Sequence, residues 1–172
     1  MAETLTTLKT RRSCRAYKPE LIEEEKLNAI LEAGTYAATG MGKQSPIILA
    51  VTDRALRDRL SKMNAAVMGA DMGPFYGAPE VVIVLANKEI PTYLYDGSLV
   101  MGNMMNAAAD LGVASCWIHR AKEEFESEEG KAILKDLGIE GNYEGIGHLI
   151  LGYAAKPENA PAPRKADYIY RV

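Results

Sequence analysis

The stretch "DGSLVMGNMMNAAADLGVASCWI", Asp96 to Ile118, predicts a buried helix followed closely by a buried strand. Its first part, through Leu111, is rich in Met, Ala and Leu and has only two acidic residues, so a helix there would be covered nearly all round. Gly112 is well placed to end that helix. The run "ASCWI", from Ala114, then has the length and composition of a strand. We expect this helix to lie in the interior of the fold or at a subunit interface.

Other apolar patterns predict the rest of a sheet and the helices around it. Short β-branched runs bounded by turn residues indicate buried strands at 47–51 ("IILAV"), 80–86 ("EVVIVLA") and 148–153 ("HLILGY"). Segments with helical periodicity alternate with these strands, at 20–31, 53–63 and 122–138. This order of elements predicts a fold that mixes α and β structure around a predominantly buried sheet.

The composition fits one soluble domain and argues against several classes of protein. A chain of 172 residues has the size of a single domain, and its 48% hydrophobic and 25% charged residues are near the averages for globular proteins. The formal net charge of -3 argues against binding to nucleic acid or an anionic membrane, since either needs a broad basic face. The longest purely apolar run, Val81 to Ala86, is far too short to span a bilayer, and the N-terminus lacks the apolar block of a signal peptide. We expect one cytoplasmic domain over residues 1–172.

The sequence offers few groups for metal or hydrolytic chemistry. Cys14 and Cys116 lack a Cys-x-x-Cys spacing, and His119 and His148 lack a His-Glu-x-x-His pattern, so we expect no metal site. The motifs G-x-S-x-G and G-x-G-x-x-G are absent as well. Cys116 could serve as a nucleophile, but inside "ASCWI" a small buried core residue is the plainer interpretation.

A cluster of arginines near the N-terminus, in "TRRSCRAYKPE" (Thr10 to Glu20), leaves two interpretations open. Arg11 and Arg12 could lie in the last turn of a first helix, where cations offset the negative end of the dipole by roughly 0.3 to 1 kcal/mol. With Ser13 and Arg15, the same residues could instead form an anion site of the kind that binds phosphate. The spacing alone favours neither.

The last residues, 154–172, differ in character from the rest. Pro157, Pro161 and Pro163 prevent a helix, so this segment is expected to run extended over a surface. Arg164 and Lys165 follow the prolines, either as a solvated basic pair or as a second clamp on the anion.

Five segments, taken together and in order, resemble the FMN-dependent nitroreductase family. They are "RRSCRAY", "AATGMGKQSP", the central Asp96–Ile118 stretch, "ILGY" and "PAPRK". The resemblance covers nearly the whole chain. It implies an α+β fold with helices around a mixed central β-sheet, assembled as an intertwined homodimer. Residues 154–172 would then be a swapped C-terminal arm, with "YIYRV" adding a strand to the neighbour's sheet.

The resemblance also implies a set of FMN-binding residues. The first motif of the family binds the FMN phosphate and ribityl chain, and the segment after the central helix lays its backbone along the isoalloxazine ring. A loop from the other subunit reaches the flavin, a further side chain contacts the ring edge, and a basic pair closes on the phosphate. Carried over in that order, the residues implicated are Arg11, Arg12, Ser13 and Arg15; Cys116, Trp117 and Ile118; Ala38, Thr39 and Gly40; Asn64; and Arg164 and Lys165. Gly42 replaces a common Asn and Ser45-Pro46 replaces Pro-Trp, which implies a more open pocket.

The activity implied is that of an oxidoreductase. NADH or NADPH would deliver a hydride to the flavin, leave, and be replaced by a nitroaromatic, quinone or related acceptor in a ping-pong cycle. No catalytic side chain is assigned, because the flavin carries the chemistry. The alternatives are an FMN-binding or regulatory protein without turnover, and a specialised flavin enzyme of the dehalogenase or desaturase type on the same fold.

Overall fold

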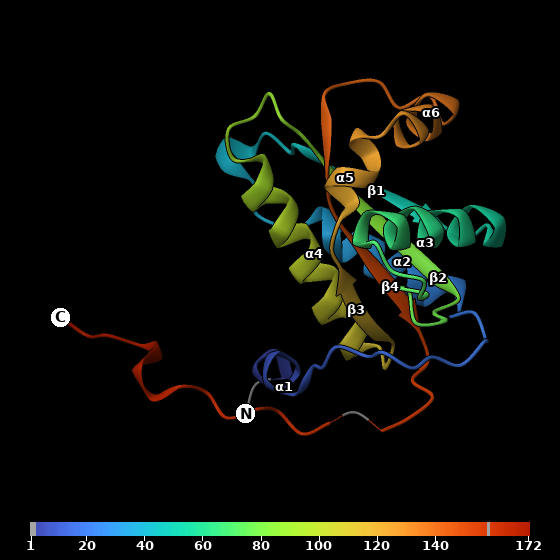
Figure 1. Cartoon of the computed structure of the whole chain (residues 1–172). Helices are drawn as coiled ribbons and strands as arrows, with labels where there is room; N and C mark the ends of the chain where they lie inside the picture. The colour runs from blue at the N-terminus through green and yellow to red at the C-terminus, as the bar shows by residue number, and fades with distance from the viewer. Residues whose placement is uncertain (1–2, 158) are drawn as a thin grey trace.

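The computed structural model describes residues 3–157 and 159–172 and contains one four-stranded sheet (Figure 1). The strands are β1 (Pro46–Val51), β2 (Glu80–Asn87), β3 (Ala114–Ile118) and β4 (Tyr143–Gly152), and they lie in the order β1-β2-β4-β3. All three pairings between them are antiparallel. The parallel component of the expected mixed sheet is limited, in the described residues, to a single bridge between Ser13 and Ser115.

The two central strands are buried on both faces because helices cover each face of the sheet. On one face, α2 (Glu24–Thr35) and α4 (Tyr93–Asp110) pack against residues such as Val82 and Leu149. The other face is covered by α3 (Arg54–Met68), α5 (Ala121–Glu126) and α6 (Glu128–Asp136), which pack against residues such as Ile83 and Ile150. Alternate residues of a strand point to opposite faces, so a continuous apolar run is what such a doubly covered strand needs. The α+β fold predicted from the sequence is confirmed.

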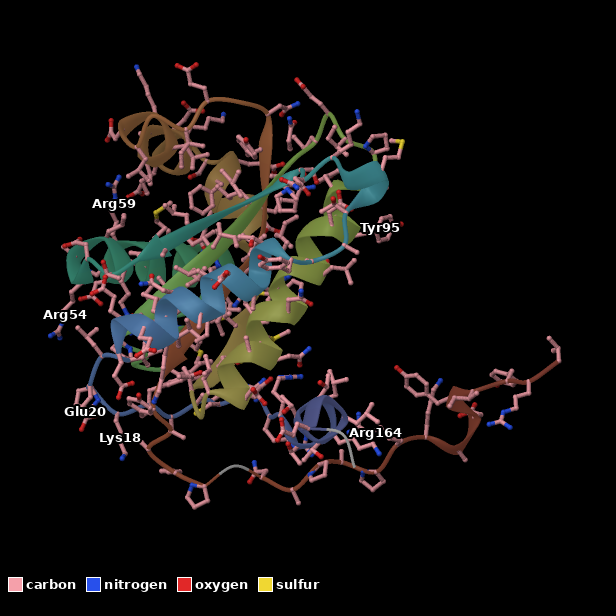
Figure 2. The ribbon with its side chains drawn as sticks, turned by 180° about the vertical axis from the view of Figure 1, so that it is seen from behind. Lys18, Glu20, Arg54, Arg59, Tyr95 and Arg164 are labelled. Carbon is pink, nitrogen blue, oxygen red and sulfur yellow. The ribbon has the colours of Figure 1, made fainter. Side chains whose placement is uncertain are left out.

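The helix α4 is buried on one side only within a single chain. Met101 and Met104 are fully buried against the sheet, whereas Tyr95 is 73% exposed and Leu99 is 50% exposed. Figure 2 shows Tyr95 directed away from the body of the fold. The expected central helix is therefore present, but its second apolar side is left uncovered by the chain's own elements.

The segment expected as one helix at 122–138 consists of two helices, α5 and α6. Ser127 separates them in an extended conformation, and its Oγ accepts a hydrogen bond from the backbone N–H of Gly130 at 3.0 Å. This side-chain cap starts a new helix in a new direction. Gly130 is needed there, because a Cβ atom at that position would lie 2.1 Å from the carbonyl oxygen of Glu124.

The C-terminal residues leave the sheet as an extended arm (Figures 1 and 2). Ala154 still forms an antiparallel bridge with Tyr17, and the N–H of Ala155 donates to the carbonyl of Ala16 at 2.9 Å. Beyond this point all the described residues are exposed. They form one short 3-10 turn, η2 (Ala166–Tyr168). Ile169 and Tyr170 are 76% and 79% exposed.

Within the described residues, no helix combines the length and the apolar character that a membrane crossing requires.

Candidate functional site

The edge of β3 brings the N-terminal arginine cluster and "ASCWI" together. The helix α1 (Glu3–Thr10) ends just before the cluster, and the chain then runs beside β3, the outermost strand on its side of the sheet. Ser13 forms the parallel bridge with Ser115, and the N–H of Cys14 donates to the carbonyl of Ser115 at 2.9 Å. Two segments about one hundred residues apart thus form one wall.

A cavity of about 540 Å³ lies at one end of this wall, and three of the residues that line it carry buried polar atoms without partners in the described chain. It is lined by Arg11, Arg12 and Ser115, together with residues 112–114 and the start of the arm. Within the described residues, Arg11 Nη1, Arg12 Nε and Ser115 Oγ are buried and make no hydrogen bond. Burying such groups unpaired is costly, so a ligand that accepts hydrogen bonds from all three would relieve the cost. Two guanidinium groups and a hydroxyl fit an anion with several oxygens, such as a phosphate.

The structure bears directly on one of the two interpretations of the cluster, the contact with the end of α1. Arg12 donates from Nη2 to the carbonyl of Lys9 at 2.9 Å and from Nη1 to the carbonyl of Arg11, so part of its guanidinium satisfies the C-terminal end of α1. Its Nε, and Nη1 of Arg11, face no such partner in the described chain. The cluster therefore caps a helix and leaves two buried donors unpaired in the described chain, and the anion site stays a prediction.

A second cavity, of about 150 Å³, lies at the other end of β3. Its lining includes Arg15, residues 116–120 and the largely apolar residues Met68, Met72 and Tyr76. The two cavities lie along one edge of the sheet, so an elongated ligand with a phosphate at one end would follow β3. The trio Cys116, Trp117 and Ile118 predicted from the sequence lines this second cavity.

The cysteines at this edge are structural. Burial raises the pKa of the Cys116 thiol, although Arg15 opposes the shift, so Cys116 is a poor nucleophile at neutral pH. Cys14, for which the sequence suggested no role, is buried, and its thiol donates to the carbonyl of Ala16 at 3.2 Å. Tyr17 donates to the carbonyl of Cys14 at 3.0 Å, and burial raises the pKa of Tyr17 as well. In the described part of the chain, no group of three His, Cys, Asp or Glu side chains could hold a metal ion.

Asn64 reaches the second cavity only through its neighbours. This α3 residue is fully buried, and its Nδ2 donates to the carbonyl of His119 at 2.8 Å and to Oε1 of Glu124. Its Oδ1 accepts from Nε of Arg120 at 3.1 Å. Glu124 in turn lies 3.2 Å from Nε2 of His148, and both side chains are fully buried. Sequence reasoning missed Arg120 and Glu124, because only the folded chain brings them to Asn64.

The loop Ala38–Gly40 lies elsewhere in the single chain and is fixed by a buried carboxylate. Asp96, at the start of α4, is 2% exposed and accepts hydrogen bonds from Gly40 N at 2.9 Å, Ser45 Oγ at 2.8 Å and Thr92 Oγ1 at 3.1 Å. Thr39 Oγ1 accepts from the N–H of Gln44 at 3.1 Å, which closes the loop on itself. None of the loop residues lines either β3 cavity.

Arg164 and Lys165 are likewise separate from the arginine cluster. Both are exposed on the arm, where Figure 2 labels Arg164. Arg164 donates to the carbonyl of Ala162 from Nη2 at 2.8 Å, and Nζ of Lys165 lies 5.4 Å from the centre of the Tyr168 ring. One chain therefore assembles Arg11–Arg15, Asn64 and residues 116–118, but neither the loop nor the basic pair.

The chain matches the protein family described as "Nitroreductase family" over residues 8–153. A protein of Archaeoglobus fulgidus whose name includes NAD(P)H nitroreductase is 32% identical over 158 residues, which cover 89% of this chain and 86% of that protein. Among solved structures, a nitroreductase with bound FMN from Bacteroides fragilis has a TM-score of 0.91 at 33% identity, with both chains fully covered. A nitroreductase with bound FMN from Desulfitobacterium hafniense has a TM-score of 0.89 at 27% identity, covering 100% of this chain and 99% of that one.

Proposed function

Because this chain belongs to the nitroreductase family, we propose that it is an FMN-dependent oxidoreductase that takes electrons from NADH or NADPH and passes them to a small acceptor. The bound FMN named in the similar Bacteroides fragilis structure supports this cofactor. The nicotinamide donor is supported by the name of the Archaeoglobus fulgidus relative.

The observation that carries the proposal is the set of buried polar atoms without partners around the larger cavity. Arg11 Nη1, Arg12 Nε and Ser115 Oγ would bind the FMN phosphate. The ring would then lie toward the smaller cavity, beside Arg15 and the backbone of residues 116–118. The residues present thus fit the cofactor at both ends of β3.

FMN supplies the hydride and electron transfer when bound, so the protein's part is to bind and orient. Arg15 offers a cation beside the ring position, where negative charge on a reduced flavin would need stabilisation. The raised pKa of Cys116 keeps that thiol protonated and out of the chemistry. Because FMN would carry the electron transfer and the protein would bind and orient it, no side chain is assigned as acid, base or nucleophile.

We propose further that the site is completed in a homodimer. The loop Ala38–Gly40 and the pair Arg164–Lys165 are predicted site residues that one chain leaves away from the cavities. The uncovered side of α4 and the exposed Ile169 and Tyr170 supply apolar surface for a second copy. The arm would cross to the partner and bring the basic pair to its phosphate. Ile169→Asp with Tyr170→Asp should shift the protein toward monomer in light scattering and lower its FMN content, and an unchanged dimer with full FMN content would argue against the arm's role.

The main experiment measures cofactor and turnover in one preparation. The purified protein should show flavin absorbance with about one FMN per chain after reconstitution, and should oxidise NADH or NADPH only when a nitroaromatic or quinone is present. FMN bound without any nicotinamide oxidation would favour a flavin-binding or regulatory protein. Nicotinamide oxidation with none of these acceptors reduced would point to a specialised flavin enzyme. Failure to take up FMN would refute the proposal.

A further inference from the structure

The turn His119–Arg120, directly after β3, holds a cation in a conformation that the fold must enforce. Arg120 has a φ of 76°, in the left-handed region that disfavours residues other than glycine. Asn64 holds this turn from both sides, since it accepts a hydrogen bond from Arg120 Nε at 3.1 Å and donates one to the carbonyl of His119 at 2.8 Å. A strained residue that the surroundings fix in place marks a candidate functional position.

The side chain that fixes Arg120 is itself rigidly held. Asn64 is fully buried and donates to Oε1 of Glu124, which is also fully buried and 3.2 Å from His148. This chain of contacts joins α3, α5 and β4, three elements of the core. The position of the Arg120 guanidinium is therefore defined by the core, although it lies at a cavity.

The smaller cavity combines this cation with an apolar wall. Its lining residues include Met68, Met72, Pro74 and Tyr76, and the described residues that line it include no acidic side chain. Among the described residues, the side chain of Arg120 makes a single hydrogen bond, through Nε, which leaves the two Nη atoms to bind a ligand. An apolar wall suits an aromatic ring, and the free fork of a guanidinium suits a carboxylate.

We propose that this cavity selects aromatic acceptors that carry a carboxylate, and that Arg120 binds that carboxylate while Asn64 and Glu124 position the arginine. The inference rests on the proposed function, because it concerns the acceptor of the same flavin site. Arg15 would serve the cofactor, so Arg120 is the cation left for the second substrate. The chain has a net charge of -3, so the Arg120 guanidinium is not part of a broad basic surface and would itself select the carboxylate.

The test compares 4-nitrobenzoate with 4-nitrobenzamide, which differ only in the charged group. Calorimetry on the oxidised, FMN-loaded protein, without any nicotinamide, gives the two dissociation constants in the absence of turnover. We expect the carboxylate to bind about ten-fold more tightly or better, as a charge-assisted bidentate contact allows. The ratio of kcat/KM for the two acceptors should show the same preference, and both preferences should fall as salt is added.

Three variants show whether Arg120 is responsible. Arg120→Gly removes the guanidinium while suiting the left-handed backbone, so it should fold and abolish the preference for the carboxylate. Arg120→Lys keeps the charge without the fork and should retain part of the preference. Arg54→Gln removes the same charge from the exposed N-terminus of α3 (Figure 2) and should leave the preference as in the unaltered protein.

The outcomes separate this inference from the proposed function. A protein that binds FMN and reduces 4-nitrobenzamide but shows no preference for the carboxylate, or keeps its preference in Arg120→Gly, overturns the inference and leaves the function standing. A raised KM for NADH in Arg120→Gly with an unchanged acceptor preference would assign Arg120 to the donor's phosphates and also overturn it. A protein that takes up no FMN refutes the function itself.

Discussion

Replacing Asp96 with alanine should destabilise the protein through the loop that it fixes. The change removes one buried carboxylate and leaves three donors, on Gly40, Ser45 and Thr92, without their acceptor. A hydrogen bond to a charged group contributes about 1.5 to 3 kcal/mol. Gly40 and Thr92 are only half-buried, so water can accept the hydrogen bonds that they lose. Ser45 is 5% exposed, so water cannot reach its hydroxyl group to replace the lost hydrogen bond. We therefore expect a loss of about 3 kcal/mol in the free energy of unfolding, or a melting temperature lower by about 6 to 12 °C.

Urea unfolding followed by circular dichroism on FMN-free protein measures this loss directly. Asp136→Ala makes the same chemical change at an exposed position at the end of α6 and should stay within about 0.5 kcal/mol of the unaltered protein. Trypsin cleavage after Lys43, an exposed residue of the same loop, should become faster in Asp96→Ala and not in the control. If Asp96→Ala matched the unaltered protein in both stability and cleavage at Lys43, the assigned role of Asp96 would be wrong.

Three further changes test other parts of the structure. Arg11→Ala combined with Arg15→Ala should weaken FMN binding by about 100-fold or more, since the phosphate loses a charge-assisted contact to Arg11 and the ring loses its contact with Arg15. Fluorescence titration with FMN measures this, and equal affinity would contradict the placement of FMN along β3. Burial raises the pKa of Glu80 above its ordinary value of 4.5, so the native state binds more protons than the unfolded state. Stability should therefore fall as the pH rises from about 4.5 through the raised pKa. Glu80→Gln should flatten this slope in urea midpoints measured across that range, and an unchanged slope would show that Glu80 is not its source. In Gly145→Ala the new Cβ would lie 2.2 Å from backbone atoms of Ala121, so thermal melting should reveal a loss of about 2 kcal/mol or more, while Gly138→Ser, at an open turn, should cost less.

The sheet was predictable because its strands are apolar on both faces. β3 runs from Ala114 to Ile118, the bounds that the sequence predicts, since Gly112 ends the helix before it and a polar residue follows. The break between α5 and α6 was missed, although Ser127 followed by two glutamates is a readable start of a helix. Helical periodicity continued across Ser127 and outweighed that local signal.

Only part of the candidate site could be predicted from the sequence. The cluster of Arg11, Arg12 and Arg15 was visible in the sequence as a candidate anion site, although its spacing alone did not decide between that and a helix end. Asp96 was counted only as an acidic residue in an apolar helix, and its three donors come from the connection between α2 and β1 and from the N-cap of α4. The contacts from Glu124 to Asn64 and His148 join residues 24 to 60 positions apart. Pairings of this kind depend on the packing of α3, α5 and β4, which periodicity does not define.

The bridge between Ser13 and Ser115 also determines when the proposed anion site can first form. During synthesis β3 emerges from the ribosome about one hundred residues after the arginine cluster, several seconds later at ordinary rates of translation. Until β3 has emerged and joined the sheet, the arginines have no wall to complete an anion site. The nascent chain must therefore extend past β3 before the proposed FMN could contribute to its stability, and folding up to that point has to proceed without a ligand at this site.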